Sequence, residues 1–205
     1  MLSADAIVKL HDETTAAWHA LPASGEDSSS ADTWLCRVAR QHHANFDLWH
    51  IEDEARTPGA SDAQLADVKR RIDRTNQLRN DLAEKLDRAL LDWLAPQRLP
   101  AEHVPLHSET PGLIIDRLSI LALKIYHTRE EAERRDASLE HCERNRERLA
   151  ILTEQRADLA RCLDVLWRET LSGTRRFKLY RQLKMYNDPT LNPAIYRNVQ
   201  SESGR

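Results

Sequence analysis

The chain has 205 residues, of which 40% are hydrophobic and 31% are charged, with only 5 Gly and 8 Pro. This length and composition favour one all-α domain with a sizeable core. The net charge of -3 excludes a general basic field of the kind that binds nucleic acid, and no apolar run approaches the roughly 20 residues of a membrane span.

Five amphipathic helices are predicted, and capping signals mark several of their ends. Ser61 or Asp62 is the candidate N-cap of the third helix, Thr110 followed by a proline begins the fourth, and Gly173 suits the left-handed position after the fifth. Long helices joined by short turns predict an all-α bundle of about five long helices, in a single domain over residues 1–196. In chain order, the helices are expected over residues 3–20, 32–56, 62–94, 111–136 and 138–171.

The remaining segments are predicted from their turn-forming and charged residues. Residues 22–32, rich in Ser, Gly and acidic groups, predict a mobile loop, and the proline-rich residues 95–110 predict a crossover loop. Residues 175–186 predict a short basic helix, residues 187–196 an extended tail with two prolines, and residues 197–205 a disordered end.

The second helix carries polar groups on the face that should be buried. At about 100° per residue, several of its residues fall on one side of the helix. They are His42, Phe46, Trp49 and Asp53 on one line, with Asn45 and Arg56 beside it.

The third and fourth helices repeat this pattern. Arg79 falls in the middle of the apolar face of the third helix, with Asn76 and Asn80 alongside. The fourth is apolar almost all round, yet four ionisable groups project within roughly one third of its circumference. Such groups are costly unless they are paired or used, so a ligand pocket and a set of register-fixing salt bridges are both open. The four are Asp116, Arg117, Lys124 and His127.

The sequence gives little support for a metal site or for a catalytic nucleophile. His43, Asp47, His50 and Glu54 lie on one line that suits a divalent ion, but HExxH and paired Glu-x-x-His motifs are absent. No nucleophile elbow and no phosphate-binding glycine loop is visible. We therefore expect neither a bound metal nor another cofactor.

The cysteines and the N-terminus bear on location. Cys36, Cys142 and Cys162 lie far apart without a CxxC motif, which indicates free thiols in a reducing compartment. The first residues lack the cationic start and apolar run of a secretory signal. A cytoplasmic protein without membrane or nucleic-acid partners is expected, and a homodimer remains open.

Four sequence blocks together resemble a bacterial family known as domain of unknown function 4254. The blocks are NFDLWHIEDEAR, VKRRIDRTNQLRNDLAEKLD, SETPGLIIDRLSILALKIYH and KLYRQLKMYNDPTLNPAIY. The resemblance covers residues 40 to 196 and implies a small cytoplasmic helical protein, encoded near glycosyltransferases of surface-polysaccharide pathways. It implies no activity, but it marks most of the polar residues named above and adds Lys184.

These observations predict one polar pocket between helices, for an anionic small molecule. The leading hypothesis is a protein that binds or processes a phosphorylated sugar or nucleotide in surface-glycan metabolism. A structural or adaptor bundle with a buried ionic network is the alternative, and a metal-dependent nucleotide hydrolase is a second one. The candidate catalytic residues are His50, Asp53, Asp116 and His127. The candidate ligand-binding residues are Asn45, Arg56, Asn76, Arg79, Asn80, Arg117, Lys124 and Lys184.

Overall fold

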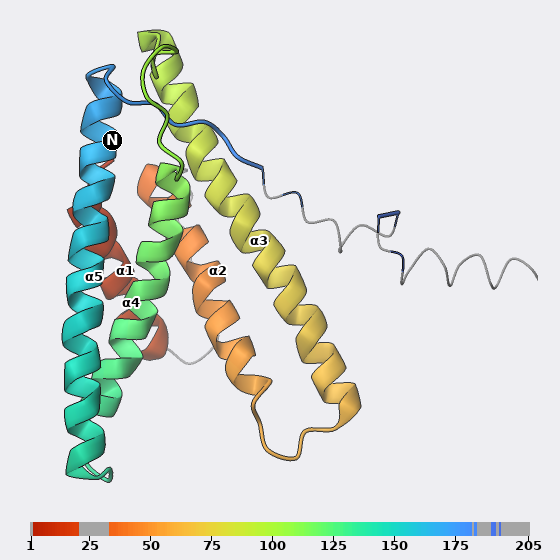
Figure 1. Ribbon diagram of the computed structural model, residues 1–205. Coiled ribbons are helices and arrows are strands. Elements are labelled where there is room, and N and C mark those ends of the chain that lie inside the picture. The colour runs from red at the N-terminus through yellow and green to blue at the C-terminus, as the bar shows by residue number, and fades with distance from the viewer. Residues whose placement is uncertain (1, 21–32, 182, 184–189, 192, 194–205) are drawn as a thin grey trace, which may run out of the picture.

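The computed structural model describes residues 2–20, 33–181, 183, 190–191 and 193 (Figure 1). Within these residues the fold is all-α, as predicted, and the helix bounds agree with the expected ones to within a few residues. A short 3-10 turn, Ala95–Gln97, follows the third helix. The α-helices are α1 (Ala4–Ala20), α2 (Trp34–Glu54), α3 (Asp62–Leu94), α4 (Pro111–Glu133) and α5 (Leu139–Leu171).

Helix α4 is the centre of the arrangement because it contacts each of the other four α-helices. It forms one antiparallel pair with α5, and α2 forms another with α3 (Figure 1). Helix α1 packs against α2, α4 and α5. The end of the α2–α3 pair that carries their connecting turn diverges from α5 (Figure 1).

The hydrophobic core lies where α3, α4 and α5 meet, with contributions from α1 and α2. Burial of these side chains supplies the main driving force for folding. The most completely buried members of the core include Ile7, Val38, Leu86, Leu90, Leu94, Ile114, Ile115, Leu118, Leu163, Leu166 and Phe177.

The start of α4 is fixed against α3 by a close backbone approach. Asp87 of α3 accepts hydrogen bonds from the Thr110 hydroxyl at 2.5 Å and from the Gly112 amide at 2.6 Å. A Cβ atom at Gly112 would lie 2.4 Å from the carbonyl oxygen of Ala83, so only glycine allows this approach. Burial raises the pKa of Asp87 to about 6.

The predicted caps are confirmed. Ser61 forms a capping box with Gln64 at the start of α3, and the Thr110 side chain accepts from the Leu113 amide. Gly173 has a φ of 70° directly after α5.

The predicted helix over residues 175–186 is wrong in its described part, because residues 175–181 are not helical. Arg176 instead forms backbone hydrogen bonds with Pro105 at 3.1 Å and His107 at 2.7 Å in the crossover loop. Phe177 is buried in the core. These non-local contacts outweigh the helical preference of a short basic segment.

Several predicted features lie outside the described residues. They are the loop over residues 22–32, most of the tail over residues 187–196, the end over residues 197–205, and Lys184. Among the helices that are described, none combines the length and the apolar character that crossing a bilayer requires.

Candidate metal centre

The structure separates the residues that were predicted to line one pocket. Arg117 lies on the exposed side of α4 and binds both carboxylate oxygens of Glu109 at 2.9 Å. Arg56, in the turn after α2, folds back onto Glu52, and Asp53 and Lys124 are exposed. The prediction that Asp116 and Arg117 share a pocket is therefore wrong. Asn76 and Asn80 are half-buried on α3.

Asn45, Arg79 and Asp116 do come together, in a closed network rather than an open pocket. Asp116, which is 6% exposed, has its carboxylate surrounded by donors. Gln41 donates at 2.6 Å, Asn45 at 2.9 Å, and the Arg79 guanidinium at 2.8 and 2.6 Å. Three of these hydrogen bonds end on Oδ1 and one on Oδ2, so both carboxylate oxygens have donors. This arrangement matches the buried ionic network that the sequence left as an alternative.

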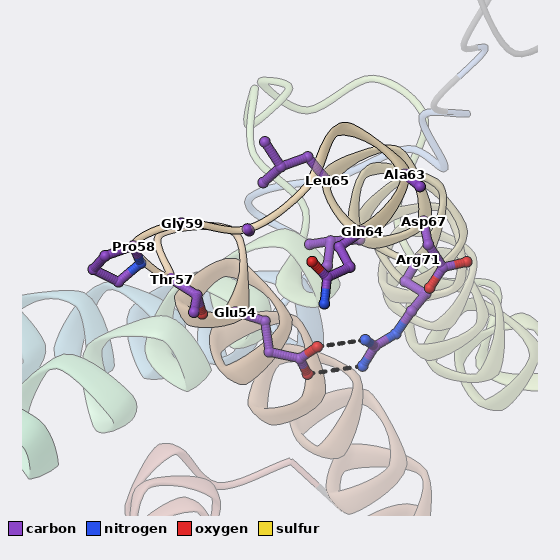
Figure 2. Close-up of a pocket in the computed structure, with 11 residues that line it drawn as sticks. Glu54, Thr57, Pro58, Gly59, Ala63, Gln64, Leu65, Asp67 and Arg71 are labelled. Carbon is purple, nitrogen blue, oxygen red and sulfur yellow. Dashed lines mark hydrogen bonds and ion pairs between the residues drawn. The ribbon is translucent and has the colours of Figure 1, made fainter.

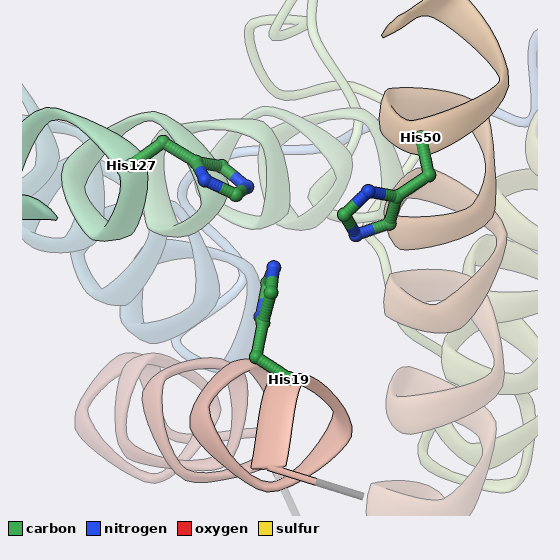
Figure 3. Close-up of side chains that lie close together, drawn as sticks. All are labelled: His19, His50 and His127. Atoms are coloured by element: carbon green, nitrogen blue, oxygen red, sulfur yellow. The ribbon is translucent and has the colours of Figure 1, made fainter. Parts of the chain in front are cut away.

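Three histidines from three different helices meet at a second polar cluster (Figure 3). His19 comes from the last turn of α1, His50 from α2 and His127 from α4, and all three are half-buried. One nitrogen from each ring lies within 4.8 Å of the other two. We call these residues the histidine cluster.

Hydrogen bonds fix the tautomers of two of these rings. His19 Nδ1 lies 2.8 Å from the carbonyl oxygen of Thr15, and His127 Nδ1 lies 2.9 Å from a carboxylate oxygen of Glu130. Both oxygens can only accept, so each Nδ1 carries the proton and each Nε2 presents a lone pair. Both Nε2 atoms are buried and have no hydrogen-bond partner.

Aromatic side chains hold the same two rings in place. Tyr126 stacks on His19 with ring centroids 4.3 Å apart, and Trp49 stacks on His127 at 4.9 Å. Stacking accounts for the positions of the two rings. It supplies no hydrogen-bond donor to their buried Nε2 lone pairs. Leaving a buried acceptor without a hydrogen bond costs about 1–3 kcal/mol of stability. A cation or a proton donor bound at these two nitrogens would remove that cost.

The surroundings of His50 favour its neutral form, which is the form that binds a cation. Burial lowers the pKa of His50, and protonation of His19 or His127 would lower it further, against the opposing effect of Asp53 and Asp47. Lone pairs on neutral imidazoles are the form that binds transition metals.

The structure thus contains a candidate ligand set that the sequence did not indicate, and the expectation that the chain binds no metal stays a prediction. The line of residues considered from the sequence does not assemble, because His43 pairs with Asp47 at 3.2 Å and Glu54 binds Arg71. Only His50 of that line reaches the cluster. His19 was missed because it lies in the first helix, which no motif singled out. The only local signal for His19 as a site residue was its position in the last turn of the first helix.

A separate depression of about 540 Å³ lies at the turn between α2 and α3 (Figure 2). The Arg71 guanidinium and the Glu54 carboxylate in its wall form two hydrogen bonds, at 2.5 and 2.9 Å. These two charges satisfy each other, and none of the predicted site residues lines this depression.

Comparisons with known proteins give one match. A family model described as "Protein of unknown function (DUF4254)" matches residues 36–179, a range that includes His50 and His127 but not His19. No curated protein and no solved structure matches the chain.

Proposed function

The chain belongs to the DUF4254 family, whose function is unknown, and we propose that it is a metal-dependent hydrolase. In this proposal His19, His50 and His127 bind a divalent transition metal of the Zn²⁺ type. The observation that carries the proposal is the pair of buried Nε2 lone pairs, on His19 and His127, that have no partner. A metal ion is a partner that both can share.

The support around each ligand resembles that of known metal sites. Histidine ligands of metals usually donate their second ring N–H to a carboxylate or a backbone carbonyl, and His127 and His19 do so to Glu130 and Thr15. Nitrogens bound tetrahedrally to Zn²⁺ at about 2.0–2.1 Å lie about 3.3 Å apart. Because the cluster nitrogens lie within 4.8 Å of one another, each nitrogen–nitrogen distance shortens by up to about 1.5 Å when the metal binds.

Three protein ligands favour catalysis over a purely structural role. Structural zinc sites have four protein ligands, whereas catalytic sites have three and keep a position for water. A bound metal lowers the pKa of that water to about 7, which supplies hydroxide at neutral pH. In hydrolysis of a phosphate ester, a hydroxide held there would form the new P–O bond as the ester P–O bond breaks, and the leaving oxygen would take up the proton that the water lost. We assign to Asp53, which is exposed and acts electrostatically on His50, the role of accepting the proton of that water.

The substrate class that we propose is a phosphorylated sugar or a nucleotide. Lys124 is exposed on α4, one helical turn before His127, where its ammonium group can approach a phosphate near the metal. The resemblance of the four sequence blocks suggests bacterial surface-glycan metabolism. The free cysteines fit a reducing cytoplasm.

The test is titration of the metal-free full chain with Co²⁺, followed by visible absorption, and assays on p-nitrophenyl phosphate and UDP-glucose with Zn²⁺. We expect one Co²⁺ per chain and a loss of affinity of at least about 100-fold in His127→Ala. His103→Ala, at an exposed histidine outside the cluster, should bind as the unmodified chain does. Failure of the unmodified chain to bind Co²⁺ or Zn²⁺ would overturn the proposal. Binding without hydrolysis would overturn its catalytic part.

A further inference from the structure

We infer that Thr15 is a positioning residue for the metal ligand His19, and that it connects this ligand to the buried network around Asp116. This inference rests on the proposed function. Its basis is the position of Thr15 on α1, one helical turn before His19, where it is 1% exposed.

Thr15 makes two contacts in two directions. Its carbonyl oxygen accepts the Nδ1–H of His19 at 2.8 Å, which fixes the tautomer that leaves Nε2 for the metal. Its hydroxyl oxygen lies 2.8 Å from Nε2 of His42 on α2. The backbone of Thr15 therefore holds the ligand, and its side chain ties that stretch of α1 to α2.

The proton positions along this connection follow from the partners of His42. His42 Nε2 also lies 3.2 Å from the carbonyl oxygen of His11, which can only accept, so Nε2 carries the proton. His42 Nδ1 then accepts from the Ser119 hydroxyl at 2.6 Å. Burial lowers the pKa of His42 to about 3, so this ring is neutral at neutral pH.

The connection continues from Ser119 to the ion pair. One Asn45 amide nitrogen donates to the Ser119 hydroxyl oxygen and to Asp116, both at 2.9 Å. Asp116 in turn binds Arg79 of α3. Hydrogen bonds between buried side chains therefore join α3, α4 and α2 to the point on α1 that orients His19.

Such a connection fixes the positions of the helices relative to one another more than it stabilises the folded chain. An apolar core of the same volume would stabilise the bundle about as well, since burying polar groups offsets much of what their hydrogen bonds contribute. A network of directional hydrogen bonds between buried side chains instead favours one arrangement of the helices. His19 needs this, because the other two ligands come from α2 and α4 and its own helix must be held in register with both.

Thr15→Val tests the inference with a change of one hydroxyl. The variant keeps the backbone carbonyl that His19 binds and leaves His42 with the His11 carbonyl as its partner. We expect its Co²⁺ affinity to fall about 10- to 100-fold, as for other residues that support metal ligands, with a changed visible spectrum of bound Co²⁺. Thr15→Ser restores the hydroxyl and should recover most of the affinity.

Thr14→Val is the matched control, because Thr14 is the neighbouring residue on α1 and its hydroxyl bonds only to carbonyls of its own helix. Ser119→Ala is the second variant, for the case that Thr15→Val does not fold, and it should weaken Co²⁺ binding in the same direction. Thr15→Val and Ser119→Ala with unchanged affinity and spectrum would overturn the positioning role while the metal site stands. Absence of Co²⁺ binding by the unmodified chain would overturn the site and the inference together.

Discussion

The Asp116 network joins α2, α3 and α4, whereas the histidine cluster joins α1, α2 and α4, and the two differ in how their ionisable groups are paired. Around Asp116, each carboxylate oxygen is bonded to at least one donor. In the histidine cluster, His19 and His127 each leave a buried nitrogen without one. Gln41 Oε1 beside Asp116 also lacks a partner, so what distinguishes the histidine cluster is that its unpartnered rings converge with a third imidazole, where one metal ion can meet all three.

Breaking the ion pair should have the largest effect. Asp116→Asn removes the charge that faces Arg79, so a half-buried guanidinium loses its partner and the amide group meets other donors. We expect the free energy of unfolding to fall by about 3–5 kcal/mol in a urea melt. Arg117→Met, which breaks the exposed pair with Glu109, should change it by less than about 1 kcal/mol. Equal small losses in the two variants would show that the Asp116 network is not structural.

Metal should stabilise the folded chain through the other cluster. Zn²⁺ at about 100 times its dissociation constant should raise the free energy of unfolding by about 2.7 kcal/mol, because the unfolded chain lacks the assembled site. The measurement is a thermal melt with and without Zn²⁺. His50→Ala should remove the increase, whereas Asp116→Asn should keep it if the variant still folds. An increase of the same size in His50→Ala would place the metal elsewhere.

Acid should destabilise the chain through the buried His42. Its pKa is lowered from 6.5 in the unfolded chain to about 3 by burial, so between these values the unfolded state binds more protons. The contribution of His42 to stability should be constant above about pH 7 and fall as the pH drops from about 6.5 toward 3, by up to about 1.4 kcal/mol per pH unit. Urea melts from pH 7 to pH 5 measure this slope, and His42→Gln should reduce it. An unchanged slope in that variant would assign the acid sensitivity to other groups.

The same substitution in the two regions should have opposite results. His127→Leu removes a buried lone pair that has no partner, so the metal-free chain should be unchanged or gain up to about 1 kcal/mol. His42→Leu should instead lose about 2 kcal/mol, because Ser119 and Thr15 lose a buried partner. Denaturation of both variants in the presence of a chelator measures the difference. Equal losses would mean that the histidine cluster is part of the scaffold.

The sequence predicted the helices well, and the caps at Ser61, Thr110 and Gly173 show why. These are local signals that act within one turn of a helix, and no distant contact overrides them. The segment after Thr174 was predicted wrongly, because backbone pairing of Arg176 with the crossover loop and burial of Phe177 depend on residues far away in the chain.

The site was harder to predict because helical periodicity gives the face of a residue but not its partners. Asp116 and Arg117 share a stretch of α4, yet one is enclosed by α2 and α3 and the other reaches Glu109 in the loop before α4. His50 and His127 were identified as site residues, but their meeting with His19 depends on how α1 packs. No pattern within α1 itself contains that information.

The most direct test of the metal centre is X-ray absorption at the zinc edge, on the full chain loaded with one equivalent of Zn²⁺. The spectrum should show three imidazole nitrogens at about 2.0–2.1 Å and one or two further oxygen ligands from water. His19→Ala should lower the imidazole count to two. Sulfur ligands at about 2.3 Å, or an unchanged imidazole count in His19→Ala, would contradict the assignment of the metal to the histidine cluster.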